Sequence, residues 1–297
     1  MADNLGHKVA VIGAGPAGIA AAVQLGRFGI DTLIFEKEKS GGLIRSAGLV
    51  ENYPGFPEGI SGPELADLFT RHLLSSGASA VFEEVLSLEY NDRVFTIKTE
   101  DGQYRAGIAV IASGTAALRP EGIEISKDAE NFVFTDITSI SELEGKKIAV
   151  IGSGDAAFDY ALNLSKKNDI DIIMRGGRPR CLPLLMERAG KEKRINILDR
   201  FDTRKIEKDG PRVLISGFRG GSKEESLETD RLLFAVGREP AMGYIGPALS
   251  ENMDLLLKEG ILYLVGDIKN GLFRQTVIAA GDGIRAAMEI EKVMSGI

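Results

Sequence analysis

The sequence predicts an α/β protein made of two similar domains, the second inserted into the first. A length of 297 residues suits about two domains. A β-branched run, a glycine-rich turn and an alanine-rich stretch follow one another twice, around residue 13 and around residue 152. Two further apolar runs that end in glycine bracket the second copy, and they could carry the chain into the inserted domain and back.

Composition excludes several classes of protein. The 36 basic and 43 acidic side chains give a charge of −7, which disfavours generic binding to nucleic acid or to anionic membranes. One cysteine, Cys181, cannot form an intramolecular disulfide, and two histidines, His7 and His72, leave little for a metal site and are expected to be solvated. No secretory signal or membrane span is apparent, and a lone thiol suits a reducing compartment, so we expect a cytoplasmic protein.

The first copy has the spacing of a nucleotide-binding βαβ unit. Residues 8–12, Lys-Val-Ala-Val-Ile, are rich in β-branched side chains and predict a buried strand, and residues 13–18 read Gly-Ala-Gly-Pro-Ala-Gly. A helix is expected from this turn to about Phe28, followed by a strand at 32–35 that ends at Glu36.

Each part of this unit has a physical role in binding a dinucleotide. Gly13 permits the sharp turn, Gly15 lets a pyrophosphate approach the backbone, and Gly18 lets helix and strand pack closely. The helix N-terminus offers free amides to the phosphates, and Glu36 is placed to accept hydrogen bonds from a ribose diol.

The second copy departs from the first at its acidic position. A strand at 147–151, the turn Gly-Ser-Gly-Asp-Ala-Ala at 152–157 and a helix to about Lys167 precede a strand at 170–174. No acid ends that strand; the arginines that follow it are Arg175, Arg178 and Arg180. An arginine here would suit the 2′-phosphate of NADP, and the alternative is a solvated basic loop.

The domain boundaries are expected at two apolar strands that end in glycine. The strands at 109–114 and 232–237 are each followed closely by a proline, Pro120 or Pro240. Residues 116–239 would then form the inserted domain, and residues 1–115 with 240–297 would form one discontinuous domain. Within the latter, residues 80–105 predict a β-meander with a turn at Asp101-Gly102.

The last section predicts a strand over 261–265, the pair Gly266-Asp267 and a helix from about Val277 to Met294. An aspartate at the carboxyl edge of a strand can hydrogen-bond a ribityl hydroxyl, and a helix N-terminus can face a flavin edge.

Together these segments resemble the flavoproteins with two dinucleotide-binding domains, and most closely the low-molecular-weight thioredoxin reductase group of the class II pyridine nucleotide-disulfide oxidoreductases. The resemblance covers nearly the whole chain, and its most specific stretches are 13–18, 51–65, which begins Glu-Asn-Tyr-Pro-Gly-Phe, and Gly266-Asp267 with Arg274-Gln275. It implies two Rossmann-like domains in a three-layer ββα arrangement, with FAD in the first, NAD(P)H in the inserted one, and a homodimer.

The turns and the resemblance together predict the cofactor contacts. For FAD these are Gly13, Gly15, Pro16, Ala17, Gly18, Glu36, Lys37, Gly41, Gly42, Asn52, Val85, Ala112, Ser113, Gly114, Gly266, Asp267, Arg274, Gln275 and Thr276. For NAD(P)H, expected to be NADPH, they are Gly152, Gly154, Asp155, Ala156, Arg175, Arg180 and Gly237. No metal site and no acid, base or nucleophile is predicted, because the cofactors supply the chemistry.

The chain departs from thioredoxin reductases at the redox-active cysteines. Counting back from Gly152, the two cysteine positions of that group fall on Thr135 and Thr138. A hydroxyl cannot cycle through a disulfide, so direct disulfide reduction by an internal dithiol is excluded, and Cys181 is expected to be a bystander. The thioredoxin-reductase-like ferredoxin/flavodoxin–NADP reductases also lack the pair, and the segments 132–147 and 154–164 resemble theirs. The family usually has His-Arg-Arg where this chain has Arg175-Gly176-Gly177.

Three functional hypotheses follow. The first is an FAD-dependent NAD(P)H oxidoreductase that serves a non-disulfide acceptor such as ferredoxin or flavodoxin. The second is a flavoprotein with a degenerate nicotinamide site, reduced by another donor. The third is a flavin-bound redox sensor or scaffold without turnover.

Overall fold

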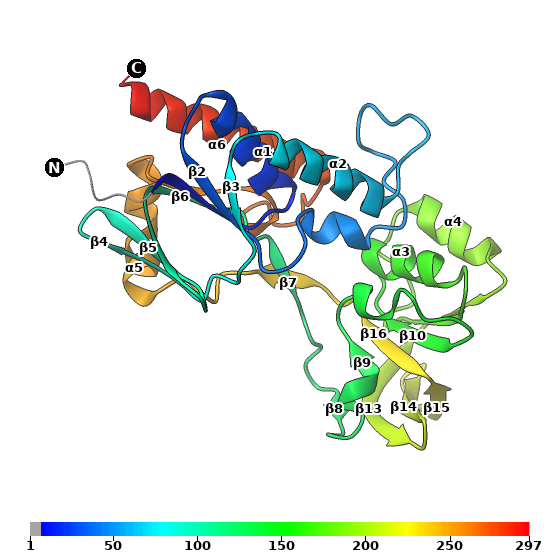
Figure 1. Cartoon of the computed structure of the whole chain (residues 1–297). Coiled ribbons are helices and arrows are strands. Elements are labelled where there is room, and N and C mark those ends of the chain that lie inside the picture. The colour runs from blue at the N-terminus through cyan, green and yellow to red at the C-terminus, as the bar shows by residue number, and fades with distance from the viewer. Residues whose placement is uncertain (1–6, 297) are drawn as a thin grey trace. The chain divides into compact units, whose positions relative to one another are not determined.

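The computed structural model of the chain describes residues 7–296 (Figure 1). These residues form two compact units. The first contains the chain through Arg45, then Val50–Ala116 and the chain from Pro240 onward. The second contains Ser46–Leu49 and Ala117–Glu239.

The first unit is built on one seven-stranded sheet. Its strands are β1 (His7–Ile12), β2 (Thr32–Phe35), β3 (Ser79–Val81), β4 (Ser87–Asn91), β5 (Val94–Lys98), β6 (Gln103–Ile111) and β18 (Leu262–Leu264). They run in the order β3-β2-β1-β6-β5-β4, and β18 also pairs with β6. β1, β2, β3, β6 and β18 are parallel, and β4, β5 and β6 form the predicted antiparallel meander.

Both faces of this sheet are buried at the centre, which explains why residues 9–12 of β1 are all apolar. The helices are α1 (Pro16–Arg27), α2 (Gly62–Leu74), α5 (Pro247–Lys258) and α6 (Thr276–Ser295). Val9 and Val11 of β1 join a core cluster with residues of α1 and α6, whereas Ala10 and Ile12 join a second cluster with residues of α5. Figure 1 shows α1 and α6 side by side.

The meander contains a turn that the sequence analysis did not predict. Thr99 and Gly102 close the expected turn between β5 and β6 with a 2.9 Å backbone hydrogen bond. The turn between β4 and β5 is made by Asp92 and Arg93, whose φ values are +51° and +63°. A hairpin turn of this handedness usually carries glycine or asparagine, so the sequence offered little sign of it.

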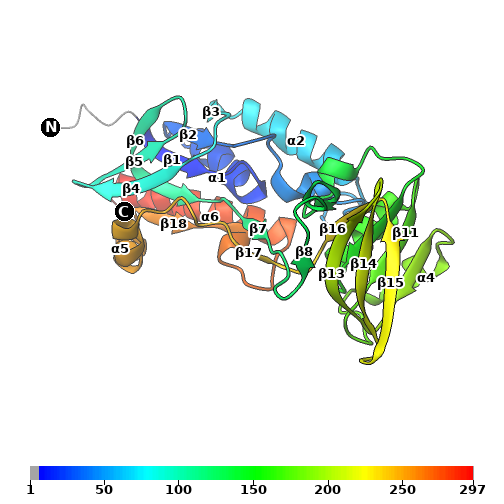
Figure 2. The same cartoon turned by 90° about the horizontal axis from the view of Figure 1, so that it is seen from below.

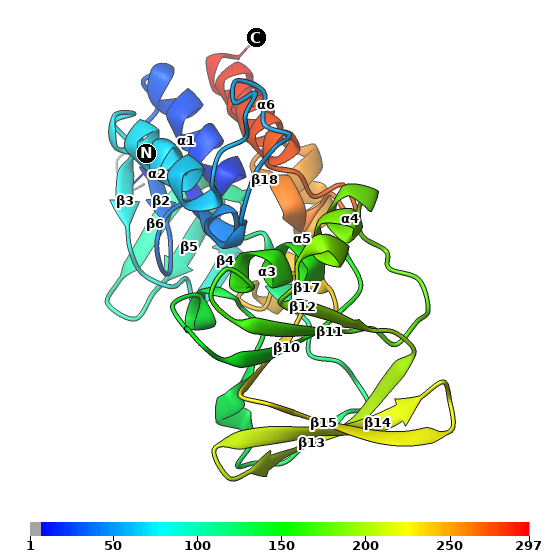
Figure 3. The ribbon, with the colours of Figure 1, turned by 90° about the vertical axis from the view of Figure 1, so that its right-hand side faces the viewer.

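The second unit has three layers. Its strands are β8 (Glu124–Ile125), β9 (Val133–Phe134), β10 (Lys147–Ile151), β11 (Asp169–Ile173), β12 (Ile195–Leu198), β13 (Phe201–Asp209), β14 (Arg212–Arg219), β15 (Lys223–Thr229) and β16 (Arg231–Phe234). Five of them form a parallel sheet in the order β12-β11-β10-β16-β9, and four form a second sheet in the order β15-β14-β13-β8. Figures 2 and 3 show β13, β14 and β15 lying together as the second sheet.

The parallel sheet lies between helices and the second sheet. Ile148 and Val150 of β10 pack in one core cluster with residues of α3 (Asp155–Leu164) and α4 (Pro183–Lys191). Ala149 and Ile151 pack in another cluster with residues of β13 and β14. This arrangement confirms the predicted α/β class with Rossmann-like parallel sheets.

Helix α3 ends at Leu164, earlier than the expected end near Lys167. The buried Asn168 side chain explains the difference, since its Nδ2 donates to the Leu164 oxygen at 3.1 Å and to the Leu143 oxygen at 2.8 Å. These bonds satisfy carbonyl groups at the helix end and turn the chain toward β11.

The two connections between the units pair with each other. β7 (Thr115–Ala117) and β17 (Arg238–Pro240) form a two-stranded sheet. Further backbone bonds extend the pairing, from the Leu118 amide to the Gly237 oxygen at 3.0 Å and from the Ala241 amide to the Gly114 oxygen at 3.1 Å.

The described residues include no helix long and apolar enough to cross a membrane.

Candidate functional site

The first glycine turn follows β1, and only two of its three glycines are enclosed by protein. A Cβ on Gly13, whose φ is +102°, would lie 2.5 Å from the Ala112 oxygen, and a Cβ on Gly18 would lie 1.9 Å from the Gly13 oxygen. A Cβ on Gly15 would meet no atom within 4 Å. Gly13 and Gly18 therefore allow chain segments to approach one another, whereas the space beside Gly15 is open to a ligand.

Helix α1 begins at this open space without a side-chain cap. Its N-cap residue is Gly15, and Pro16 occupies the first turn. The amides of Ala17 and Gly18 therefore have no partner within the helix. Free amides at a helix N-terminus, together with the helix dipole, suit a pyrophosphate.

Glu36 follows β2 directly beside the turn. Its Oε2 accepts a hydrogen bond from the Ala14 amide at 2.9 Å, and its Oε1 accepts one from the Glu38 amide at 3.1 Å. Each carboxylate oxygen has a second lone pair, so the group can still accept from a ribose hydroxyl. Lys37, the next residue, is exposed.

Gly41 and Gly42 lie against the same turn. The Gly41 amide donates to the Ala14 oxygen at 2.7 Å, and a Cβ on Gly42 would lie 3.1 Å from the Gly15 Cα. Their φ values of +113° and +56° fall where glycine is favoured. The structure thus brings this pair to the first glycine turn.

Arg45, which the sequence analysis missed, holds the segment that carries these glycines. Its Nε donates to the Ser40 oxygen at 2.6 Å, and its Nη2 lies 2.9 Å from the Asp67 Oδ1 on α2. The Ser40 hydroxyl also hydrogen-bonds the Thr70 hydroxyl at 2.8 Å. The acidic partner lies 22 residues further along the chain, so no local motif indicates the contact.

Ser113 is fixed between two segments of the first unit. Its hydroxyl donates to the Ala241 oxygen at 2.8 Å and accepts from the Tyr244 hydroxyl at 3.0 Å. Burial raises the pKa of Tyr244 far above its ordinary value, so this hydroxyl stays protonated and remains a donor. Val85 is buried in the core cluster that contains Leu88, so its side chain packs within the protein.

Gly266 and Asp267 follow β18 and lie beside the first turn of α1. A Cβ on Gly266, whose φ is +76°, would lie 2.8 Å from the Ala17 Cβ. Asp282 of α6 holds this turn: its Oδ2 accepts from the Gly266 amide at 3.2 Å and from the Asn270 Nδ2 at 2.7 Å. The sequence analysis did not identify Asp282, because its role depends on the fold of the turn beneath it.

An Asp282→Ala variant should loosen the Gly266-Asp267 turn. Each lost hydrogen bond to a charged group is worth roughly 1.5–3 kcal/mol, so we expect FAD retention to fall about tenfold and the melting temperature to drop by a few degrees. The flavin-to-protein absorbance ratio after gel filtration measures the first, and a circular dichroism melt the second. Asp254→Ala on the exposed face of α5 is the control. Equal flavin content in both variants would contradict this role.

Asn52 and Gln275 meet although they are 223 residues apart in the sequence. The Asn52 Nδ2 donates to the Gln275 Oε1 at 2.7 Å. Gln275 is the N-cap residue of α6, Thr276 begins that helix, and the partly buried Arg274 precedes them. Two residues that the resemblance places near a flavin are therefore brought together.

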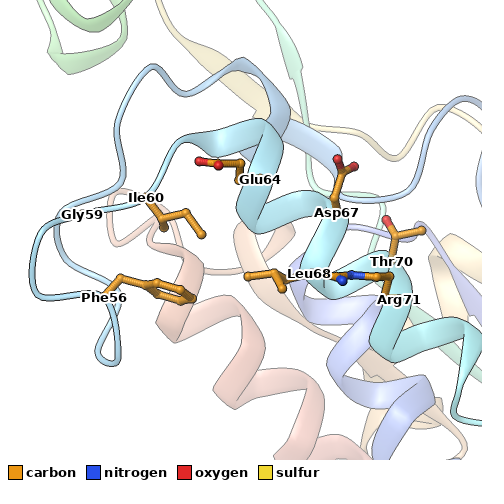
Figure 4. A pocket seen from close by; sticks show the side chains of 8 residues that line it. All are labelled: Phe56, Gly59, Ile60, Glu64, Asp67, Leu68, Thr70 and Arg71. Carbon is orange, nitrogen blue, oxygen red and sulfur yellow. The ribbon is translucent and has the colours of Figure 1, made fainter.

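Two cavities lie in the segment that contains Asn52. The larger, of about 670 Å³, lies between the loop that carries Phe56 and Ile60 and helix α2, which carries Leu68 and Arg71 (Figure 4). None of the residues predicted to hold FAD lines it. The smaller, of about 290 Å³, is lined by residues 51–57 and includes Asn52.

The second glycine turn repeats the geometry of the first. A Cβ on Gly152 would lie 2.4 Å from the Ala235 oxygen and 2.9 Å from the Ala157 Cβ, whereas a Cβ on Gly154 would meet no atom within 4 Å. Helix α3 starts here with Gly154 as an N-cap that lacks a side-chain bond, followed by Asp155 and Ala156. The same kind of open, amide-lined space therefore exists in both units.

The loop after β11 folds back onto this second turn. The Arg180 amide donates to the Ser153 oxygen at 2.6 Å, and its Nε lies 3.3 Å from the Ser153 hydroxyl. The Leu182 amide donates to the Asp155 Oδ1 at 2.7 Å. Arg180 is thus brought to the turn, and Arg175 is exposed at the end of β11. Gly237, at φ +133°, lies in the return connection.

Thr135 and Thr138, where the count from Gly152 puts the cysteine positions, lie beside a capped polar turn. The Asp136 Oδ1 accepts hydrogen bonds from the Thr138 amide, at 2.7 Å, and from the Thr138 hydroxyl. Ile137 and Ile140 anchor the turn in the core. Thr138 therefore belongs to a structural turn in the second unit, and Thr135 directly precedes Asp136, which caps it.

Cys181 and the two histidines show no catalytic arrangement. Cys181 packs against the core cluster that contains residues of α3, and burial together with the Asp155 charge raises the pKa of its thiol. His7 lies 3.0 Å from the Asp31 carboxylate, and His72 is exposed on α2. Among residues 7–296, no three His, Cys, Asp or Glu side chains are grouped to hold a metal ion.

The fold and the paired turns define an α/β protein with two Rossmann-like dinucleotide folds. A sequence model of the pyridine nucleotide-disulphide oxidoreductases matches residues 7–291, so the chain belongs to that family. It is therefore a thioredoxin reductase-like member of a family of FAD-dependent, NAD(P)H-using oxidoreductases.

Three relatives illustrate the range of similarity. A thioredoxin reductase of Mycolicibacterium smegmatis is 28% identical, with 96% of each chain covered. A 34.2 kDa protein in the rubredoxin operon of Clostridium pasteurianum is 30% identical, again with 96% of each covered. The structure of Lactococcus lactis thioredoxin reductase matches with a TM-score of 0.86 at 26% identity, covering 98% of this chain and 100% of that one.

Proposed function

We propose that this protein moves electrons between NAD(P)H and an acceptor other than a disulfide, using FAD as its redox cofactor. The observation that carries the proposal is the combination of two intact glycine turns with threonines at both cysteine positions. The chain has one cysteine in all, so it cannot form the internal dithiol that disulfide transfer requires.

The residues of the first unit fit FAD. The open space at Gly15 and the free amides of α1 suit the pyrophosphate, and Glu36 suits the adenosine ribose. Asp267 suits the ribityl chain, and the turn that carries it is held by the bond from the Gly266 amide to the Asp282 carboxylate. The Asn52–Gln275 pair suits the edge of the ring. Bound FAD supplies hydride and electron transfer, and these side chains bind and orient it.

The second unit is proposed to bind NADPH. Gly154 leaves space for a pyrophosphate at the start of α3. Arg175 and Arg180 lie at the edge where the adenosine ribose binds in such folds, and a guanidinium there favours a 2′-phosphate.

A second candidate function is a flavoprotein with a degenerate nicotinamide site, which takes electrons from another donor or acts as a sensor. The contacts of Ser153 and Asp155 favour it, because both are already bonded to the loop at 180–182. A dinucleotide could bind at this turn only if the loop at 180–182 gave up some of these hydrogen bonds.

A small electron-carrier protein, such as ferredoxin or flavodoxin, is the proposed partner. The rubredoxin-operon relative supports this idea, because its gene lies with that of a small electron carrier. We further propose that the protein is a homodimer. We also propose that it works in the reducing cytoplasm, which is consistent with its lone cysteine.

Anaerobic stopped-flow mixing with NADH and NADPH separately tests the proposal. We expect rapid bleaching of the flavin absorbance, faster with NADPH. Bleaching by reduced ferredoxin alone would favour the degenerate site, and retained FAD with no turnover would favour a sensor. A colourless protein that takes up no FAD would overturn all three.

A Cys181→Ser variant should keep the full rate of flavin reduction and turnover. The raised pKa keeps this thiol protonated near neutral pH, so iodoacetamide should react with it slowly and faster only as the pH rises above its ordinary pKa. Mass spectrometry of alkylated samples measures the reaction. If alkylation at neutral pH abolished turnover, the thiol would belong to the redox path.

A further inference from the structure

The carboxyl ends of β10, β11 and β12 form one edge of the parallel sheet in the second unit. Ile151 pairs with Ile173, and Ile173 pairs with Leu198, so these three strands end level with one another. The glycine turn, the arginine loop and residues 199–200 therefore leave the sheet at the same edge. In open α/β folds, ligands bind outside this edge.

Arg200 lies across the loop that follows β11. A Cβ on Gly177 would lie 3.4 Å from the Arg200 Nε and 3.7 Å from its Cγ, so the arginine side chain covers that glycine. Arg200 has a φ of +51°, which is uncommon for a residue with a side chain. Its amide donates to the Gly176 oxygen at 3.5 Å, a long hydrogen bond that links the two loops.

The Arg200 guanidinium forms one ion pair, through Nε, and is otherwise exposed. Its Nε lies 3.5 Å from the Asp199 Oδ2, and its side chain is 71% exposed. Its terminal nitrogens form no hydrogen bond within residues 7–296. The two terminal nitrogens of an arginine present two parallel N–H groups, which match two oxygens of a phosphate.

We propose that Arg200 is a specificity-determining residue that binds the 2′-phosphate of NADPH together with Arg175 and Arg180. Gly176 and Gly177 offer no side chain from β11, and a larger residue at 177 would crowd the Arg200 side chain. Arg200 supplies a guanidinium from the end of β12 to the surface beside Gly177, in the loop that also carries Arg175 and Arg180. This inference rests on the proposed nicotinamide function of the second unit.

Calorimetric titration of the full chain with adenosine 2′,5′-bisphosphate and with 5′-AMP tests the assignment, because the two ligands differ only in the 2′-phosphate. Arg200→Gln should weaken binding of the bisphosphate by roughly 10- to 100-fold and change 5′-AMP binding by less than about twofold. The bisphosphate affinity of Arg200→Lys should lie between those of the parent and Arg200→Gln, since lysine keeps the charge but loses the paired N–H donors of the guanidinium. Arg194→Gln, exposed at the opposite end of β12, is the matched control and should match the parent.

Each other outcome counts against the assignment. Unchanged bisphosphate binding in Arg200→Gln, equal losses for both ligands, or a parent without preference for the bisphosphate would overturn it. If NADPH still bleached the flavin in those cases, the proposed function would stand without Arg200. If the parent bound neither ligand and neither nicotinamide bleached the flavin, the proposed nicotinamide function would fail as well.

Discussion

A Gly18→Ala variant is expected to melt on the order of 10 °C below the parent and to lose its flavin. The added Cβ would lie 1.9 Å from the Gly13 oxygen, and that oxygen belongs to the backbone, which cannot move aside as a side chain can. Overpacking of a buried contact costs roughly 3 kcal/mol when the surroundings cannot relax. A circular dichroism melt and the flavin absorbance of the purified variant measure both effects.

The control for this variant is Gly281→Ala on the exposed face of α6. A Cβ at Gly281 would meet no atom within 4 Å. Alanine is the better helix former by about 1 kcal/mol, so this variant should melt at or slightly above the parent temperature. A Gly18→Ala protein as stable as the control would show that α1 does not pack on β1 as described.

Gly15→Ala and Gly154→Ala should separate the two cofactors. Both glycines have φ values that alanine adopts readily, −78° and −96°, and both have open space where the Cβ would be. We expect both variants to fold normally. The methyl group would instead occupy the path of a pyrophosphate, so cofactor affinity should fall roughly 10- to 100-fold in the affected unit only.

Flavin content and NADPH binding distinguish the two variants. Gly15→Ala should be purified with little FAD and regain it only at high FAD concentration. Gly154→Ala should be yellow but should bleach with NADPH only at raised NADPH concentration. Loss of flavin in Gly154→Ala, or full flavin in Gly15→Ala, would contradict the assignment of one cofactor to each turn.

The glycine turns were predictable because their information is local. A β-branched strand, three glycines at fixed spacing and a helix start occupy fewer than about 20 residues, and each part reinforces the others. The same holds for Glu36, which follows the next strand and which in the structure accepts a hydrogen bond from the Ala14 amide. The resemblance to a family added Asn52 and Gln275 as separate candidates, and only the structure shows that they contact each other.

The residues that hold the turns in place were not predictable in this way. Arg45, Asp282 and Arg200 act through contacts with segments that approach only after folding, and each is an ordinary charged residue in its local sequence. The strands of the second sheet in the inserted unit are similar: β14 and β15 are polar on one face, so alternation rather than a motif marks them. Contacts between residues that are distant in the sequence can be identified only once the fold is known.

The pairing of β7 with β17 has a consequence for how such a chain could be rearranged by recombination. Since Leu118 and Gly237 are joined by a backbone hydrogen bond, a gene cassette that begins and ends at these codons would encode a polypeptide whose ends already meet. That cassette could be exchanged for a homologous one, or it could be deleted and the two ends joined by a short hairpin loop. In both cases the two points where the chain is rejoined would be adjacent in the folded protein.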